Sequence, residues 1–368
     1  MRDVVIVYGK RTAIGAFGGS LKDVPVVDLG ATVMKGVLKN SGLRPHTSDE
    51  CIKFAPDSIR DEKLIDLEAR FYDYEESLKP INIDMVYMGN VLPMGQGQNT
   101  CRQAMIRAGV SKETSATTVN KLCASGMEAV VLGTQAIRCG DADVVLAGGM
   151  ESMSRVPYAL PGARWGQRMG DGELVDLLVY DGLHEYFYGY HMGMTAENIA
   201  AKYGISRTEQ DELGVQSHSR ALAAIKDGLF EEEIVEVLVP QRRGEPLSFK
   251  VDERPMETSL EKMAKLRTAF KKDGSVTAGN ASGINDAAAA LLLMAEDKAR
   301  DLGIQPLVKI KAYSSAGLDP AYMGLGPIPA VRKILAGHNY TITDFDSIEL
   351  NEAFAVQALA CMQELGCD

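Results

Sequence analysis

The sequence has no excess of positive charge and no long apolar run. Its 368 residues include 39 Lys and Arg against 50 Asp and Glu, a formal net charge of -11, and the sequence pI is near 5.1. Nucleic acids and anionic membranes bind preferentially to basic protein surfaces, so this excess of negative charge argues against both as partners. No apolar segment reaches membrane-spanning length. The first residues, "MRDVVIVYGKRTAIG", run straight into a strand pattern, and we expect no signal peptide or presequence.

Paired cysteines are also missing. The six cysteines show no CxxC spacing and no grouping with histidine, which excludes a disulfide framework and a zinc site from the expectations. At 46% hydrophobic and 24% charged residues, the composition is that of an ordinary globular protein. We therefore expect a reduced, cytoplasmic protein that carries no metal.

Short apolar strands alternate with helical patterns, as in an α/β protein whose sheet is joined by crossover helices. The segments "DVVIV" and "DADVVLAGG" are predicted to be buried strands, because they are short and β-branched. After Cys123, the spacing of Met127, Val130, Val131 and Ile137 predicts one inward helical face, and Gly140 is expected to end that helix.

A weak internal repeat predicts two similar halves. The first copy starts at "DVVIVYGKRTAIGAF" and the second at "LVKIKAYSSAGLDP". In each, a strand leads to a Gly-rich loop, a helix and a second strand, which for the second copy is expected in "FDSIELNEAF". The second copy reaches Asp368 where its counterpart of the cysteine segment would begin, so this half is expected to be incomplete.

These patterns predict a division into four parts. Residues 1–155 form a first core half, with a solvated, charged insertion near 46–80. Residues 156–282 form a loop domain or lid, 283–304 return to the first half, and 305–368 form the second half. Between Asp49 and Lys79 the insertion has ten acidic residues and five basic ones, which is typical of surface decoration without chemistry.

Cys123 is the candidate nucleophile. A lone cysteine usually packs in a core as a small apolar residue. Without its sequence context, Cys123 would be interpreted in this way. The local context favours reactivity, because Ala124, Ser125 and Gly126 leave room for a large thioester. The helix that follows directs its N–H groups and positive dipole end at the sulfur. Such a setting favours a thiolate and could also hold an oxyanion.

Several ordered segments carry a resemblance to a known family. They are "RTAIGAFGGSL", "NKLCASGMEAV", "VVLAGGMESMSRVPY", "FYGYHMGMTAENIA", "AKLRTAF", "SVTAGNASGINDAAAA" and "LNEAFA". In these segments and their order the chain resembles the thiolases, specifically the acetyl-CoA acetyltransferases, over nearly its whole length. Ala13 departs from the family, which usually has proline there.

The resemblance implies the thiolase fold, with two similar βαβα halves in an α-β-α-β-α layered arrangement below a loop domain. It implies that two acetyl-CoA condense to acetoacetyl-CoA and CoA, or the reverse thiolysis, by ping-pong transfer through a Cys123 thioester. Coenzyme A is then a substrate or product, no separate cofactor is expected, and the expected assembly is a homodimer or homotetramer. Residues 157–181 are the candidate tetramer contact.

Site residues carry over position by position. Cys123 would take the acyl group, and Asn351 would hold a water at the enolate oxygen, with Glu352 supporting its turn. The residues implied in substrate binding are Leu183, His191, Met192, Ala278, Ser282, Met323, Ala353 and Phe354. The alternative for "TAGNASG" is a tight turn built on Gly279 and Gly283, and for His191 a structural histidine. Candidates for the CoA phosphates are Lys202, Arg207, Lys265, Arg267, Lys271 and Lys272.

Two signatures of the family do not occur in the printed sequence. These are a GHP motif, whose histidine deprotonates the nucleophilic cysteine, and a C-x-G-G-G motif, whose cysteine acts as acid and base. "GHN" at 337–339 precedes "NEAF" and lacks the proline. Proton transfers of this kind are worth roughly 10²–10⁴-fold each, so the chain as printed is expected not to turn over. The alternatives are a non-catalytic CoA-binding or interaction subunit and, more remotely, a ketoacyl synthase.

Overall fold

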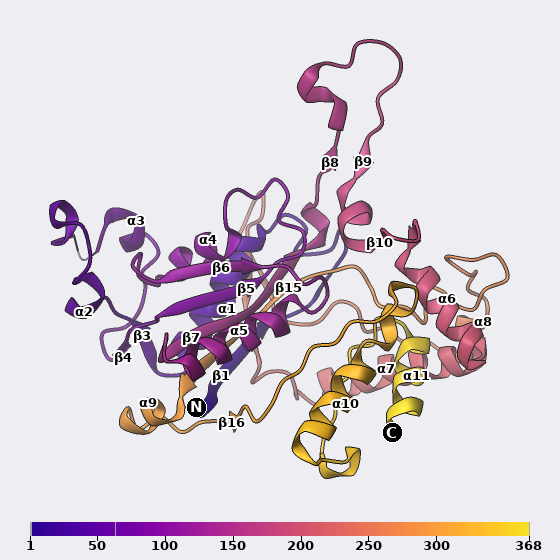
Figure 1. Ribbon diagram of the computed structural model, residues 1–368. Helices are drawn as coiled ribbons and strands as arrows, with labels where there is room; N and C mark the ends of the chain where they lie inside the picture. Colours follow the sequence, from indigo (N-terminus) through magenta and orange to yellow (C-terminus); the bar gives the residue numbers. More distant parts are fainter. Residues whose placement is uncertain (1, 63, 368) are drawn as a thin grey trace. The chain divides into compact units, whose positions relative to one another are not determined.

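The computed structural model describes residues 2–62 and 64–367 (Figure 1). These residues fall into two compact units. Unit 1 comprises Met1–Leu178, Phe230–Glu253 and Asn285–Lys311. Unit 2 comprises Val179–Leu229, Arg254–Ile284 and Ala312–Asp368. The chain therefore passes repeatedly between the units, and each unit combines segments that are distant in the sequence.

Unit 1 is organised around a mixed sheet. Its strands are β1 (Val4–Thr12), β2 (Gly15–Ala16), β5 (Met85–Gly89), β6 (Ser115–Val119), β7 (Val144–Ser152), β12 (Ile234–Val235), β15 (Asn285–Ala295) and β16 (Val308–Lys309). The main path has the order β12-β1-β15-β7-β5-β6, with β16 paired to β1 and β2 paired to β15. β15 is antiparallel to β1 and β7, whereas β5 is parallel to β7 and β6.

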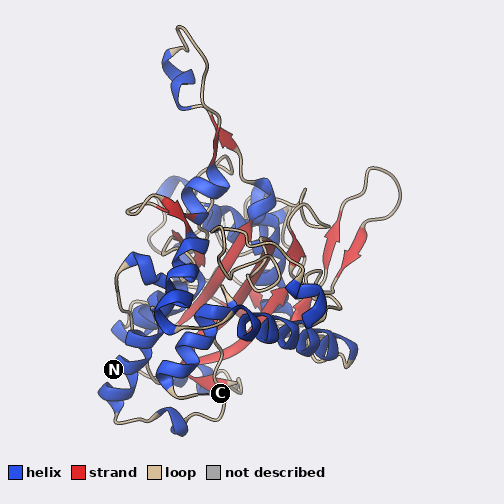
Figure 2. Ribbon diagram, turned by 90° about the vertical axis from the view of Figure 1, so that its right-hand side faces the viewer, coloured by secondary structure: helices blue, strands red, loops and turns tan. Residues whose placement is uncertain are grey.

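Helices cover both faces of this sheet (Figure 2). Those of unit 1 include α1 (Val26–Asn40), α4 (Thr100–Arg107), α5 (Ser125–Cys139) and α9 (Glu296–Asp301). Val144 and Leu146 of β7 pack in one core with α1 and α4, while Val145 and Ala147 pack in another with α5. Successive strand side chains point to opposite faces, so a sheet covered on both sides needs continuous apolar runs. The buried strands predicted from "DVVIV" and "DADVVLAGG" are confirmed as β1 and β7.

The helix after Cys123 forms as predicted, but a different face of it packs on the sheet. Met127 is 75% exposed, and Val130 and Val131 are only half-buried. The buried positions are mostly small: Ser125, Ala129, Gly133, Thr134, Ala136 and Ile137. Small residues lie inward because the helix backbone approaches the strands closely: a Cβ on Gly133 would lie 2.9 Å from a side-chain carbon of Leu293. The expected end at Gly140 is confirmed, with φ of 84°.

The charged insertion contains short helices among its described residues. They are α2 (Asp49–Ile52), η1 (Asp57–Ile59) and α3 (Asp66–Ala69), and β3 (Leu43–Pro45) pairs with β4 (Lys79–Ile81) at its base. Most of its charged side chains are exposed. Glu68 is the exception, at 2% exposed, and it accepts hydrogen bonds from the backbone N–H groups of Ile65 (3.1 Å) and Lys112 (2.6 Å). Glu68 is therefore a buried carboxylate that ties the insertion to Lys112, elsewhere in unit 1.

The remaining elements of unit 1 are short. β8 (Tyr158–Ala159) pairs with β9 (Val175–Asp176), and β13 (Val237–Val239) pairs with β14 (Leu247–Phe249). The 3₁₀ segments η2 (Met153–Arg155) and η3 (Pro161–Trp165) lie between β7 and β9.

Unit 2 is mainly helical. It contains α6 (Met192–Tyr203), α7 (Arg207–Lys226), α8 (Leu260–Ala264), α10 (Pro327–His338), α11 (Ala355–Leu365), the hairpin β10 (His184–Glu185) and β11 (Tyr190–His191), and η5 (Pro320–Leu325) and η6 (Ile342–Asp344). The π-helical segment η4 (Leu178–Leu183) precedes this hairpin. One apolar cluster joins α6, η5 and α11 through Ile199, Leu325, Phe354, Val356 and Cys361. Across the described residues of both units, no helix combines the length and apolarity needed to cross a membrane.

The strand expected in "FDSIELNEAF" is not formed among the described residues. Residues 345–350 have no strand assignment, and Phe345 and Ile348 are 40% and 43% exposed. The first strand of the second copy, β16, has only two residues and pairs with β1 in unit 1. A strand requires a neighbouring backbone to satisfy its N–H and C=O groups, and the described part of the chain offers residues 345–350 none.

Candidate active site

Cys123 lies in a tight turn between β6 and α5, and its side chain is exposed. The backbone N–H of Ala124 donates to the carbonyl of Lys121 (3.2 Å), and that of Ser125 donates to the carbonyl of Leu122 (2.9 Å). Leu122 has φ of 50°, a left-handed conformation that is costly for a residue other than glycine. This conformation, immediately before Cys123, allows the chain to reverse and leaves the thiol at the surface, two residues before Ser125, the first residue of α5.

Side chains on both sides hold this turn in place. The Ser125 hydroxyl accepts a hydrogen bond from Lys121 N (2.8 Å) and donates one to Leu122 O (2.6 Å). Asn120 Oδ1 accepts from Leu122 N (3.0 Å), and its Nδ2 donates to Val91 O (3.3 Å). The strained residue is therefore fixed by hydrogen bonds to its N–H and to its carbonyl. Sequence reasoning treated Ser125 only as a small residue.

Three glycines bring the start of α5 close to the sheet. A Cβ on Gly89, at the end of β5, would lie 2.5 Å from the carbonyl carbon of Ser125 and 2.6 Å from the nitrogen of Gly126. A Cβ on Gly149 of β7 would lie 3.3 Å from the Cα of Gly126. No side chain fits at Gly89 without displacing the helix backbone, so its lack of a side chain decides where the first turn of α5 lies.

A buried carboxylate supports the loop beneath the turn. Glu151, at the end of β7, accepts hydrogen bonds from Asn90 Nδ2 (2.6 Å), Val91 N (2.7 Å) and Leu92 N (3.1 Å). Burial raises the pKa of Glu151, and these donors oppose that effect. Glu151 holds the N–H of Val91, and Asn120 in the Cys123 turn donates to the carbonyl of Val91. Glu151 therefore supports the turn indirectly, through Val91. The sequence contained it in "GGMESM", but no local pattern marked its role.

Cys123 belongs to unit 1, and the other residues implied by the resemblance belong to unit 2. Within unit 2, two of the implied segments are hydrogen-bonded to each other. Ser282 N donates to Ala353 O (3.0 Å), Ala355 N donates to Asn280 O (2.9 Å), and Ala281 forms a bridge with Phe354. The structure thus joins the turn that carries Ala278 and Ser282 to the "NEAF" segment.

An aromatic cluster links His191 to Phe354. The His191 ring stacks on Phe270 with centroids 4.6 Å apart, and Phe270 meets Phe354 edge to face at 6.2 Å. His191 Nδ1 accepts from Gly193 N (3.0 Å) and caps α6. Burial, and to a lesser degree His184, lowers the pKa of His191 and favours the neutral imidazole. Phe270 was not singled out from the sequence, although it lies in the quoted segment "AKLRTAF".

The remaining implied residues lie around this cluster or at the surface. Met323 and Ala353 are half-buried and pack against the apolar cluster of unit 2. Met192 is the first residue of α6, and Leu183 is the last of η4. Asn351, like Ala278 and Ser282, is exposed.

Two further side chains are already engaged within unit 2. Arg207, a candidate for the CoA phosphates, donates to Asp211 Oδ2 (2.7 Å) and to the carbonyl of Met263 (2.7 Å), so its guanidinium is occupied within unit 2. Cys361 is fully buried in α11, its Sγ donates to Gly324 O (3.3 Å), and burial raises the pKa of its thiol to about 11. Cys361 is therefore a packing residue.

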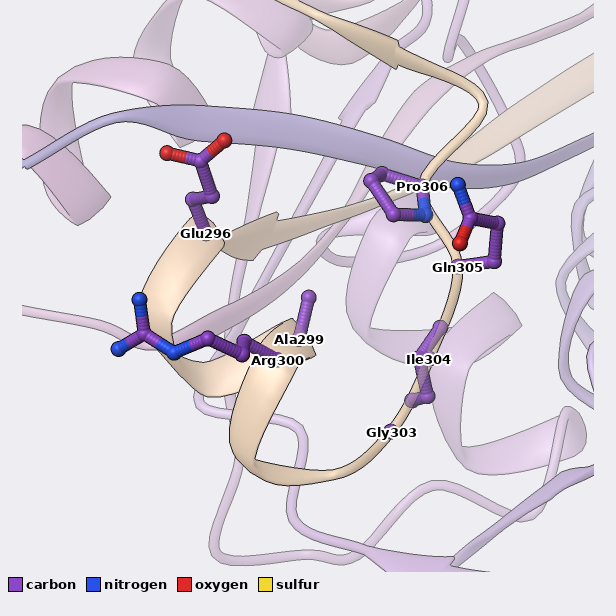
Figure 3. Close-up of a pocket in the computed structure, with 7 residues that line it drawn as sticks. All are labelled: Glu296, Ala299, Arg300, Gly303, Ile304, Gln305 and Pro306. Atoms are coloured by element: carbon purple, nitrogen blue, oxygen red, sulfur yellow. The ribbon is translucent and has the colours of Figure 1, made fainter.

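A hollow beside α9 in unit 1 is lined by none of these residues (Figure 3). It is lined by Glu296, Ala299, Arg300, Gly303, Ile304, Gln305 and Pro306. Its carboxylate, Glu296, already pairs with Lys309 at 2.7 Å. The hollow thus offers no group that the chemistry of a reactive thiol requires.

Comparisons with known proteins cover nearly the whole chain. The thiolase N-terminal domain matches residues 4–53 and 58–297, and the thiolase C-terminal domain matches residues 304–368. An acetyl-CoA acetyltransferase from Chromobacterium violaceum is 50% identical over 365 residues, which are 99% of this chain and 84% of that protein. One from Pseudomonas aeruginosa is 48% identical over 369 residues, 100% of this chain and 85% of that protein.

A solved structure shows the same fold. The crystal structure of the Bacillus anthracis acetyl-CoA acetyltransferase superposes with a TM-score of 0.88 at 40% sequence identity, covering 100% of this chain and 84% of that one. The mixed α/β architecture expected from the ordered motifs is confirmed as the thiolase fold.

Proposed function

Because the chain belongs to the thiolase family, we propose that it is an acyltransferase that exchanges acetyl groups between CoA esters through a thioester on Cys123. The reaction is the condensation of two acetyl-CoA to acetoacetyl-CoA and CoA, or its reverse. The observation that carries the proposal is the exposed thiol of Cys123 in an anchored, strained turn at the start of α5.

The first half-reaction follows from this geometry. The Cys123 thiolate attacks the thioester carbonyl, the new S–C bond forms, and the bond from that carbon to the CoA sulfur breaks. CoA leaves as a thiolate and takes up the proton that Cys123 lost. The N–H groups of Gly126 and Met127 have no acceptor within the described part of the chain. They lie at the positive end of the helix dipole and remain available as hydrogen-bond donors. The field there favours both the attacking anion and the oxyanion that forms.

In the second half-reaction another acetyl-CoA loses an α-proton to a base and becomes an enolate, whose α-carbon attacks the acyl-Cys123 carbonyl. The new C–C bond forms, the S–C bond to Cys123 breaks, and the Cys123 thiolate is released with acetoacetyl-CoA as the product. The family assignment gives Asn351 the task of holding a water at the enolate oxygen. What supports this role is the bonding of the "NEAF" segment to the turn that carries Ala278 and Ser282, since both segments are assigned to the same CoA ester.

Mass spectrometry of the acylated protein tests the proposal. Protein incubated with acetyl-CoA should gain one acetyl group, which maps to the peptide that contains Cys123. Cys123→Ala should abolish the modification, whereas Cys139→Ala, which removes the other exposed cysteine, should not. If CoA binds and no acyl group is transferred to the folded wild type, the chain is a non-catalytic CoA-binding protein and the proposal is wrong.

We also propose that the chain works as a homo-oligomer that uses the hairpin of β8 and β9. The loop that joins these strands projects away from the sheet of unit 1 (Figure 1) and exposes large apolar side chains, with Trp165 87% and Met169 93% exposed. Exposed apolar surface of this kind marks association sites. Light scattering should show a smaller assembly for Trp165→Ser with Met169→Ser than for the wild type, and an unchanged mass would contradict the assignment.

A further inference from the structure

Helix α7 contacts both segments that the proposed function assigns to the CoA ester in unit 2. Asp211, Gly214 and Ser217 are spaced three residues apart, which places them along one side of the helix. Asp211 and Gly214 meet the turn at 277–283, and Ser217 meets the "NEAF" segment. This side of α7 is called the scaffold face below.

The strongest contact of the scaffold face is a buried one. Asp211 Oδ1 accepts a hydrogen bond from Asn280 Nδ2 at 2.9 Å, and both residues are 3% exposed. Asp211 Oδ2 accepts from the Nε of Arg207 at 2.7 Å. Arg207 in turn donates to the carbonyls of Met263 (2.7 Å) and Leu266 (3.2 Å). The carboxylate is therefore paired on both oxygens and held from both sides.

This contact decides how the Asn280 amide is oriented. An ionised carboxylate accepts hydrogen bonds and cannot donate them, so it selects the Nδ2 side of the amide. The Oδ1 of Asn280 is then left to accept from Thr277 N at 2.8 Å, and Nδ2 also reaches Ser275 O at 3.1 Å. With Asp211 in place, the turn that carries Ala278 and Ser282 has one arrangement of donors and acceptors.

The same residue extends this control to the second segment. The backbone carbonyl of Asn280 accepts from Ala355 N at 2.9 Å, beside the bond from Ser282 N to Ala353 O at 3.0 Å. A shift of Asn280 would therefore move Ala353 and Phe354 as well as Ser282.

The other two residues of the scaffold face, Gly214 and Ser217, also contact the two segments. A Cβ on Gly214 would lie 2.8 Å from the carbonyl oxygen of Gly279, so only glycine lets the helix lie against this turn without displacing it. Ser217 Oγ donates to Glu352 Oε2 at 2.7 Å, next to Asn351. Unlike the Asp211 contact, this tie lies at the surface.

We propose that Asp211 is a positioning residue for the CoA ester, acting through Asn280 to set the turn at 277–283 and the "NEAF" segment together. It touches no substrate atom itself. The inference rests on the proposed function, because it takes those two segments as the binding surface.

Two measurements on Asp211→Asn test the proposal: the Kd for CoA by calorimetry, and the half-saturating concentration and maximal rate of Cys123 acylation by acetyl-CoA. An amide cannot accept from both Asn280 and Arg207, so one charge-assisted bond is lost. We expect Kd and the half-saturating concentration to rise on the order of tenfold, with a maximal rate that changes much less. Asp227→Asn, the same substitution at the exposed C-terminal cap of α7, should leave all three values unchanged.

A double-mutant cycle shows whether Asp211 acts through Asn280. If it does, Asp211→Asn combined with Asn280→Ala should weaken CoA binding no more than Asn280→Ala alone. Additive losses, or an unchanged Kd in folded Asp211→Asn, would overturn the proposal. If Asp211→Asn does not fold, Gly214→Ala provides the same test, and an unchanged Kd there would equally overturn it. If the wild type binds CoA but Cys123 is not acylated, only the proposed function is refuted. The comparison of Kd values then still tests whether Asp211 positions the CoA-binding segments.

Discussion

Cys123 and Cys139 provide a comparison within one helix, and alkylation should distinguish them sharply. Cys123 precedes the first residue of α5, Cys139 is its last residue, and both are exposed. A helix dipole favours an anion at the N-terminus and disfavours one at the C-terminus, by about 0.3–1 kcal/mol at each end. The two ends together give about 0.6–2 kcal/mol, so Cys123 should react about 3- to 30-fold faster than Cys139.

The other cysteines should not obscure the comparison. Burial raises the pKa of the Cys101 thiol to about 12 and that of Cys361 to about 11, so both hold their protons at neutral pH. Cys51 and Cys367 are half-buried and should react at intermediate rates.

The assay uses a limiting amount of iodoacetamide at neutral pH, followed by digestion and mass spectrometry of the cysteine peptides. Protein unfolded in urea is the control, because the six thiols should then react at similar rates. Salt screens the dipole, so molar salt should bring the ratio of rates in folded protein towards one. Equal labelling of Cys123 and Cys139 at low salt, or faster labelling of Cys139, would show that α5 does not activate the candidate nucleophile.

Four further substitutions have directions that the structure sets. Gly89→Ala should lower the free energy of unfolding by about 1–3 kcal/mol, because its Cβ meets the backbone of α5. Gly337→Ala, in open space on α10, should raise it by about 0.5–1 kcal/mol, and urea titration compares the two. Burial raises the pKa of Asp286 above 3.8, so the folded protein holds this proton more tightly than the unfolded chain, and wild-type stability falls as the pH rises through that window. Asp286→Asn removes this term, so its stability relative to wild type should improve as the pH rises above 3.8; a pH-independent difference would refute this. Ser282→Phe should raise the half-saturating concentration of acetyl-CoA without lowering the urea midpoint, and an unchanged value would mean that "GNASG" is only a turn.

Local patterns in the sequence determined the elements whose cause is local. β1 and β7 follow from short β-branched runs, and the helix after Cys123 ends at Gly140, where a left-handed φ favours glycine. The charged insertion exposes most of its charged side chains, as its composition predicts. The ordered motifs pointed to the thiolase family before any fold was known, because each motif depends only on residues close together in the chain.

Only the tertiary structure decided which of those residues support one another. Asp211 is hydrogen-bonded to Asn280, 69 residues away in the sequence, and Glu151 to Val91, 60 residues away. The predicted inward face of α5 was wrong at Met127, because Gly89 and Gly149 let the helix backbone lie against the strands and small residues fill the contact. Periodicity specifies that a helix has an apolar side. Which side is buried, and which distant carboxylate fixes a turn, depends on where other segments lie once the chain has folded, and no local spacing encodes that.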